Sequence, residues 1–417
     1  MRNFCKKTKS VLLVLLAFVF PISLAATNAL IALGFLCWLI EGNFKTKFKT
    51  LKENIFIKLF LGIISVLLIS AFFSDSITGG FLISSGYKNE YQFILKHFVW
   101  FFVFFVLLLT SDVKKEKLIS AFLIGMFFSE IVSYLIYFRL IDLNYFKSLG
   151  LINRGAQYIN PTPFMHHTFY SIFLAVSIVL IMDKLKSFRG VMKFVSILFL
   201  ISATVNLFIN GGRTGQLAFV LSVFVYAVLK YRHFKAVMLS LLLIAGVLFS
   251  AYKFSPVFHK RVNMALHNLV EVREGNFNTS WGKRIAVDIV GFELLKNPKV
   301  FIFGLGAGDA KEKFFNFAKE YNRKMFNQFK NLVHLHNQFL QFWMDGGIFL
   351  MILYLLWFVF WYRLSPTPLS ATLIVIFVFA SFSDVIMYRP KTFMLFLFLT
   401  SLSICRETSN TGRDSAL

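Results

Sequence analysis

Long, nearly uninterrupted apolar runs are the feature that most constrains this chain. A helix of roughly 17 to 25 apolar residues can cross the hydrocarbon layer of a membrane, where it satisfies its own backbone hydrogen bonds. The sequence therefore predicts an all-α integral membrane protein with about twelve transmembrane helices. The runs lie at residues 10–24, 26–41, 56–73, 92–110, 118–138, 165–183, 193–209, 214–230, 236–252, 337–362, 368–383 and 391–405.

Basic residues between the runs predict the orientation of the helices. The net charge of +24 does not sit on a soluble basic surface, so we expect no nucleic-acid partner. We attribute the charge to lysine and arginine residues that fix the orientation of the helices and lie beside anionic membrane lipids. With a cytoplasmic N-terminus, the inner segments hold 22 Lys and Arg residues and the short outer segments hold 8. The other 14 lie in one long outer loop, to which the charge rule does not apply. Both termini are therefore predicted to be cytoplasmic.

The long loop divides the chain into four parts. Residues 1–251 are predicted to hold nine transmembrane helices, 252–336 a largely helical lid, 337–405 three further helices and 406–417 a cytoplasmic tail. The first 25 residues imitate a signal peptide, but the apolar sequence continues to Ile40, which favours an uncleaved hairpin. The lid has 14 basic and 7 acidic residues. That excess suits an anionic lipid-linked substrate, or simply lipid headgroups.

Two arginines stand where they could meet an anion. Arg213 lies in the short outer turn "NGGRTG" between two apolar runs, where an arginine is costly unless it has a partner. Its planar guanidinium matches a pair of phosphate oxygens, although it could also extend to lipid headgroups. Arg284 begins an amphipathic helix in the lid, in "SWGKRIAVDIV", among several other basic residues.

Two histidines and an asparagine precede the tenth apolar run, in "NLVHLHNQFL". His334 and His336 have no third ligand at convincing spacing, so we predict no metal site. A histidine is instead a natural general base for a sugar hydroxyl. Asn337 could cap the helix, orient a neighbour or bind substrate. The alternative is an interfacial histidine paired with backbone.

Other polar residues belong to the same outer rim or to the membrane interior. His166 and His167 begin the sixth run and Arg389 precedes the twelfth, so all three could line one cavity as substrate-binding residues. Glu130 lies within the fifth run and must pair, become protonated or face the bundle interior. "GLGAGD" at residues 304–309 lacks the strand–turn–helix context of a dinucleotide site, and we expect no nucleotide cofactor.

This constellation resembles the O-antigen ligase family of inner-membrane glycosyltransferases. Similar sequences combine about twelve spans, a long late periplasmic loop, an arginine in a glycine-bearing turn and a second arginine in the loop. A histidine then opens the next span in the pattern H-[N/S/Q]-x9-G-x-x-G. His336, Asn337 and Gly347 match this pattern, whereas Leu350 replaces its last glycine. The likeness in residues is confined to about 210–215 and 280–350.

The resemblance implies roles for particular residues. Arg213, Arg284 and His336 would take the essential catalytic positions, and Asp384 in the last outer loop would match an acidic residue of some relatives. The implied reaction transfers a glycan from undecaprenyl diphosphate to lipid A–core at the periplasmic face of a Gram-negative inner membrane, without a cofactor. O-antigen polymerases and O-linked protein oligosaccharyltransferases share this layout and remain alternatives.

A transporter of lipids or polysaccharides is the alternative from another functional class. Such proteins carry ionisable groups near the middle of the membrane and are often built from two similar halves. Here the polar candidates gather at the outer rim, with Glu130 as the exception, and the sequence has no evident internal repeat. The pattern therefore favours an enzyme.

Overall fold

The helical fold predicted from the apolar runs is confirmed. The computed structural model describes residues 2–76, 78, 80 and 89–404, and this part of the chain is built from helices, with no β-strand. The predicted tail at 406–417 lies outside the described residues. Within the described part, nine helices are long and apolar enough to cross a membrane. The chain is thus a multi-pass membrane protein.

Each predicted span corresponds to a helix, or in one case to a continuous run of three helical segments. These are α1 (Arg2–Val19), α2 (Leu24–Glu41), α4 (Ile55–Phe72), the run α5 (Glu90–Phe93), η2 (Ile94–Val99) and α6 (Trp100–Leu109), α7 (Lys115–Tyr137), α9 (His167–Lys184), α10 (Gly190–Ile209), α11 (Arg213–Tyr231), α12 (Phe234–Phe254), α18 (Gln338–Leu364), α19 (Pro368–Ser383) and α20 (Pro390–Ile404). The apolar helices α19 and α20 are shorter than the others.

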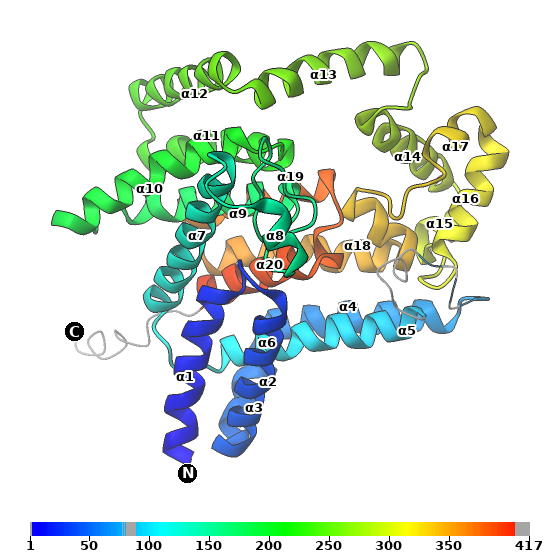
Figure 1. Cartoon of the computed structure of the whole chain (residues 1–417). Coiled ribbons are helices and arrows are strands. Elements are labelled where there is room, and N and C mark those ends of the chain that lie inside the picture. The colour runs from blue at the N-terminus through cyan, green and yellow to red at the C-terminus, as the bar shows by residue number, and fades with distance from the viewer. Residues whose placement is uncertain (1, 77, 79, 81–88, 405–417) are drawn as a thin grey trace.

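The remaining helices lie between the spans. Two of them, α3 (Phe44–Glu53) and α8 (Leu143–Ser148), join spans in the first half of the chain, and the 3-10 turn η3 (Ile386–Tyr388) joins α19 to α20. The lid contains five: α13 (Pro256–Arg273), α14 (Ser280–Leu294), α15 (Pro298–Phe303), α16 (Ala310–Tyr321) and α17 (Arg323–Phe329). Helices α12 and α13 form an arm along one edge of the molecule, whereas α14 to α17 gather near α18 (Figure 1).

Segments predicted to share a side of the membrane contact one another. The Lys391 ammonium donates to the backbone carbonyls of Pro21, Ile22 and Phe164, at 3.2, 3.1 and 2.8 Å. Phe164 and Lys391 belong to predicted outer segments, and Pro21 and Ile22 lie near the outer end of the first predicted span. Among predicted inner segments, the buried Glu41 carboxylate pairs with Lys9 at 2.6 Å and Lys47 at 3.0 Å. The contacts are thus consistent with the predicted alternation of the helices.

The lid is fastened to the end of α4. The Asp309 carboxylate accepts hydrogen bonds from the backbone N–H groups of Asp75 and Ser76, each at 2.6 Å. The N–H groups of Ala307 and Gly308 donate to the hydroxyls of Ser70 and Ser74, at 2.9 and 3.0 Å. The "GLGAGD" segment is therefore a docking loop of the lid, which gives its glycines a structural role.

A sharp kink divides α18 after its second turn. Gly346 and Gly347 leave helical geometry, and Gly347 has a φ of 66°, which favours glycine. A Cβ at Gly347 would lie 2.1 Å from the carbonyl oxygen of Ile302, so the lid backbone needs this glycine to approach α18. The matched glycine of the family pattern thus serves packing, and the buried Leu350 fills the position of the missing one.

Candidate functional site

The glycine turn before α11 holds Arg213 against the start of α9. Gly212 approaches α9 so closely that a Cβ would lie 2.3 Å from the Ser171 hydroxyl. The Asn210 side chain accepts from the N–H of Gly212 at 2.9 Å, and Gln216 donates to the carbonyl of Asn210 at 2.9 Å. These buried amides fix the turn. The half-buried Arg213 begins α11, and its Nη2 has no partner in the described part of the chain.

Three arginines converge at this turn. A side chain on Gly211 would come within 2.9 Å of Arg261 Nη2, so the arm helix α13 brings that guanidinium onto the turn. The charges of Arg261 and Arg284 both act on Arg213. Arg284 reaches the turn from α14: its Nη1 donates at 3.2 Å to the Ser383 hydroxyl, which also contacts Thr214.

The arginine cluster, defined as Arg213, Arg261 and Arg284, lacks close carboxylate partners. Among the described residues none of the three forms an ion pair within 4 Å, although Asp384 and Asp288 act on Arg284 at longer range. Burial lowers the pKa of Arg284, but guanidinium groups stay charged at neutral pH. A partly buried group of like charges is costly without a counter-ion. The cluster is therefore suited to bind an anion.

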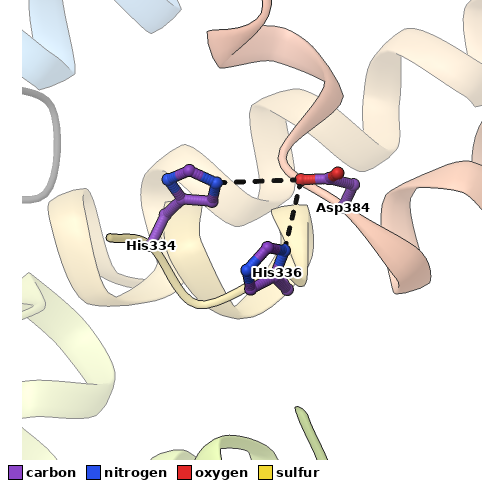
Figure 2. A group of neighbouring side chains, drawn as sticks. All are labelled: His334, His336 and Asp384. Carbon is purple, nitrogen blue, oxygen red and sulfur yellow. Dashed lines mark ion pairs between the residues drawn. The ribbon is translucent and has the colours of Figure 1, made fainter. Parts of the chain in front are cut away.

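His336 and Asp384 form a pair beside this cluster. Figure 2 shows one carboxylate oxygen of Asp384 facing both His334 and His336. This Oδ1 lies 3.6 Å from His336 Nδ1 and 4.0 Å from His334 Nε2. His336 has a φ of 54°, an uncommon value for a residue other than glycine. Such backbone strain gathers at functional sites. It turns the half-buried imidazole toward the carboxylate that ends α19.

Neighbouring groups keep Asp384 ionised and His334 neutral. Burial would raise the pKa of Asp384, but His336 and Arg389 outweigh it and hold the pKa below its ordinary value. Burial and the Arg389 charge lower the pKa of His334 to about 3. The Arg389 guanidinium donates to His334 Nε2, so a neutral His334 accepts this bond. His334 and Arg389 thus support Asp384 from one side.

Asn337 has both ends of its amide engaged. Its Oδ1 accepts from the N–H groups of Phe339 and Leu340, at 3.0 and 3.2 Å, and so caps α18. Its Nδ2 donates at 3.1 Å to Asp288 on α14, whose pKa is raised by burial to about 6. Asn337 therefore caps α18 and joins the lid to its start, directly after His336, and its contact with substrate stays a prediction.

The two histidines that begin α9 complete the rim. His166 caps α9 through Thr168, and the charges of Asp384 and Arg389 act on it. His167 lies within electrostatic reach of all three members of the arginine cluster. The predicted residues Arg213, Arg284, His336, His334, Arg389, His166, His167 and Asp384 are therefore brought together, from helices or loops far apart in the sequence.

Arg261 and Ser383 belong to the site but were not singled out from the sequence. Arg261 is one of many basic residues in the lid, and amphipathic spacing does not say which of them turns toward the membrane. Ser383 contacts both Arg284 and Thr214, but a serine at the end of an apolar run has no distinguishing signal. Glu130, predicted to require compensation, is buried within α7.

One group in the described residues has the composition of a metal site. The ligand atoms of His334, His336 and Asp384 lie within 4.8 Å of one another, and Asp384 supplies the third donor that spacing alone did not reveal. However, His334 Nε2 already accepts a bond from the Arg389 guanidinium. A cation at this point would face a second positive charge. These three residues therefore fit a histidine paired with a carboxylate better than they fit the ligands of a metal ion.

Comparison with known proteins relates the segment that contains much of this site to a protein family. A model of the O-antigen ligase family matches residues 197–355, from α10 into α18. The matched segment includes the arginine cluster, His334, His336 and Asn337, whereas His166, His167, Asp384 and Arg389 lie outside it. No curated protein matches the chain. Over residues 197–355, the chain is therefore similar to the O-antigen ligase family.

Proposed function

We propose that this protein is an O-antigen ligase, a glycosyltransferase that moves a glycan from undecaprenyl diphosphate to a sugar hydroxyl of lipid A–core. The observation that carries the proposal is the arginine cluster without close carboxylate partners beside the His336–Asp384 pair. A diphosphate is the anion that two or three convergent guanidinium groups suit. The pair beside it supplies a base and a carboxylate that orients the base.

The donor would bind by its diphosphate and by its tail. Arg213, Arg261 and Arg284 contact the phosphate oxygens, with His167 beside them. An apolar cavity of about 1020 Å³ lies between α7, α9, α10, α11 and α12 and is lined by residues such as Phe208, Val247 and Ser255. Phe208 and Ser255 lie close in sequence to Arg213 and Arg261, so a polyprenyl tail in this cavity would lead to the cluster.

His336 would act on the acceptor. The imidazole takes the proton of the acceptor hydroxyl while that oxygen forms a bond to the anomeric carbon. The bond from this carbon to the phosphate oxygen breaks, and the lipid diphosphate leaves with the electron pair, its added negative charge stabilised by the arginines. A single displacement inverts the anomeric centre. Asp384 orients His336 and stabilises the imidazolium, whereas His166, His334 and Arg389 line the acceptor side.

The proposed location of the site follows from the proposed substrates. We propose an inner-membrane protein of a Gram-negative bacterium with both termini in the cytoplasm and residues 252–336 as a periplasmic lid. The lid, the glycine turn before α11 and the loop after α19 then face the periplasm, where both lipids enter from the outer leaflet. Membrane lipids surround the remaining helices.

Removal of the encoding gene tests the reaction. A strain without it is expected to lose O-antigen from its lipopolysaccharide and to accumulate the undecaprenyl-linked glycan, because the last transfer is blocked. Gel electrophoresis of lipopolysaccharide is the measurement, with a plasmid copy of the gene as control. Retention of a single repeat on lipid A–core would instead identify a polymerase. Loss of glycoprotein with normal lipopolysaccharide would identify a protein oligosaccharyltransferase.

Removal of divalent metal tests the donor set of His334, His336 and Asp384. Purified protein treated with EDTA is expected to transfer glycan at its untreated rate, because the proposed steps use a guanidinium cluster and an imidazole. Transfer of the purified donor lipid to purified lipid A–core is the measurement. An activity that is lost with EDTA and restored by added metal would reassign these three residues as ligands.

A further inference from the structure

A buried carboxylate in α18 joins the two segments that carry the His336–Asp384 pair. Asp345 Oδ2 accepts a hydrogen bond from the Tyr388 hydroxyl at 2.5 Å and a second from Gln341 Nε2 at 2.9 Å. All three side chains are buried. Neither Asp345 nor Tyr388 is used by the proposed transfer chemistry, so this costly polar arrangement inside the molecule needs another explanation.

Each of the two hydrogen-bond donors, Tyr388 and Gln341, connects Asp345 to the segment that carries one member of the His336–Asp384 pair. Tyr388 belongs to the turn that follows Asp384 and precedes Arg389. Gln341 accepts, through its Oε1, the N–H of Leu335 at 3.2 Å, and Leu335 stands between His334 and His336. The two loops, which the Arg389–His334 bond also joins, are thus both tied to Asp345, one directly through Tyr388 and the other through Gln341. A parallel link runs from the N–H of Met387 to Gln338 Oε1, at 2.8 Å.

The kink of α18 holds this group of three side chains, Asp345, Tyr388 and Gln341, which we call the Asp345 node. The backbone carbonyl of Asp345 accepts from the Ser70 hydroxyl of α4, and that of Met344 accepts from the N–H of Leu305 at 2.7 Å. The node therefore rests on α4 and on the docking loop of the lid. Rigid support of this kind keeps a catalytic group within the small tolerance that catalysis allows.

The His336–Asp384 pair depends on such support because its own contact is long. The 3.6 Å between His336 Nδ1 and Asp384 Oδ1 exceeds a hydrogen bond, and this Nδ1 has no hydrogen-bond partner among the described residues. The strained φ of His336 also has to be imposed from outside. The backbone around each group must therefore fix their separation.

We infer that Asp345 and Tyr388 are positioning residues that hold His336 and Asp384 in register. The consequence of this positioning for glycan transfer rests on the proposed function, whereas its effect on the geometry of the His336–Asp384 pair does not. Tyr388→Phe removes one of the two bonds to Asp345 and keeps the ring in place. Asp345→Asn keeps an acceptor oxygen and is therefore the conservative variant. Tyr134→Phe is the matched control, since it removes a hydroxyl bond of 2.7 Å to the carbonyl of Ser202.

The first measurement reports on the pair without any substrate. Carbethoxylation of His336 by diethyl pyrocarbonate, followed by mass spectrometry of the full chain in nanodiscs, is expected to be about threefold or more faster in Tyr388→Phe, because the loop opens more often. Asp345→Asn and Tyr134→Phe should react like the unaltered protein. An unchanged rate in Tyr388→Phe, or an equal increase in Tyr134→Phe, overturns the inference.

The second measurement is glycan transfer. Tyr388→Phe is expected to lower kcat by about 10- to 100-fold, as small misplacements of a reacting group do, and to leave the KM for donor lipid unchanged because the arginine cluster is intact. In a His336→Ala background the same substitution should cause no further loss. Losses that multiply overturn the inference. Faster carbethoxylation with unchanged transfer would instead refute the catalytic role of His336 and leave the positioning role standing.

Discussion

Replacement of His336 by alanine is expected to lower glycan transfer by about 10²- to 10⁴-fold, the range that a positioned general base contributes. The protein should remain in the membrane, because the helix start is capped by Asn337 rather than by His336. The reason for the large effect is that His334, the histidine next to His336 in Figure 2, is not an equivalent base. His334, whose pKa burial and Arg389 lower to about 3, is occupied by the Arg389 guanidinium.

The measurement is transfer by purified protein, together with the lipopolysaccharide pattern of a complemented deletion strain. His267→Ala on α13 is the matched control, since that histidine is exposed and pairs with Glu271 on its own helix. Asp384→Asn should produce a smaller loss, because it removes the charge that orients His336 and leaves the imidazole present. Normal long-chain lipopolysaccharide in the His336→Ala strain would exclude His336 as the base.

Apolar run length predicted the helices well because the membrane leaves the backbone few options. A buried backbone must pair its own polar groups, so a long apolar run such as 193–209 becomes a helix such as α10 whatever its neighbours are. Only local details differ. The kink at Gly346 and Gly347, for example, follows from the approach of the lid backbone, which is a tertiary contact.

The candidate site could be predicted only where a residue type conflicts with its surroundings. Arg213 in a glycine turn and His336 before an apolar run are conspicuous, because charged and polar groups are costly at a membrane rim. Asp384 was suggested by family resemblance alone. Arg261 was missed because its role depends on α13 folding back over the turn, where the Ser255 hydroxyl bonds the carbonyl of Phe208 at 2.8 Å.

The Asp345 node was missed for a related reason. Asp345 follows an apolar stretch of α18 and looks like a helix-ending residue in the sequence "WMDGG". Its function as an acceptor depends on Tyr388, 43 residues later in the chain, whose hydroxyl donates to the Asp345 carboxylate in the folded protein. Long-range pairing of this kind has no local pattern, whereas helix caps such as Asn337 do.

Arg213→Lys is expected to lower transfer by about 10²- to 10³-fold, close to the loss in Arg213→Ala and comparable to removal of one preorganised donor at a developing negative charge. A lysine preserves the charge, but it is a point donor that cannot offer two parallel N–H groups to one phosphate. The position also disfavours it. Arg213 is half-buried, its Nη2 has no partner among the residues that the structure describes, and two arginines lie nearby, so a compact ammonium would be poorly hydrated and repelled.

Arg323→Lys on α17 is the control for this substitution, because Arg323 is an exposed arginine of the lid. It should leave transfer unchanged. The effect of Arg213→Lys can fall on kcat or on the KM for donor lipid. An arginine that holds the ground-state diphosphate raises KM when it is lost, whereas one that meets the charge arising as the bond breaks lowers kcat. Since the cluster already has three guanidinium groups, ground-state binding should survive the loss of one, and we expect the larger change in kcat. A lysine variant with full activity would mean that net charge alone recruits the donor.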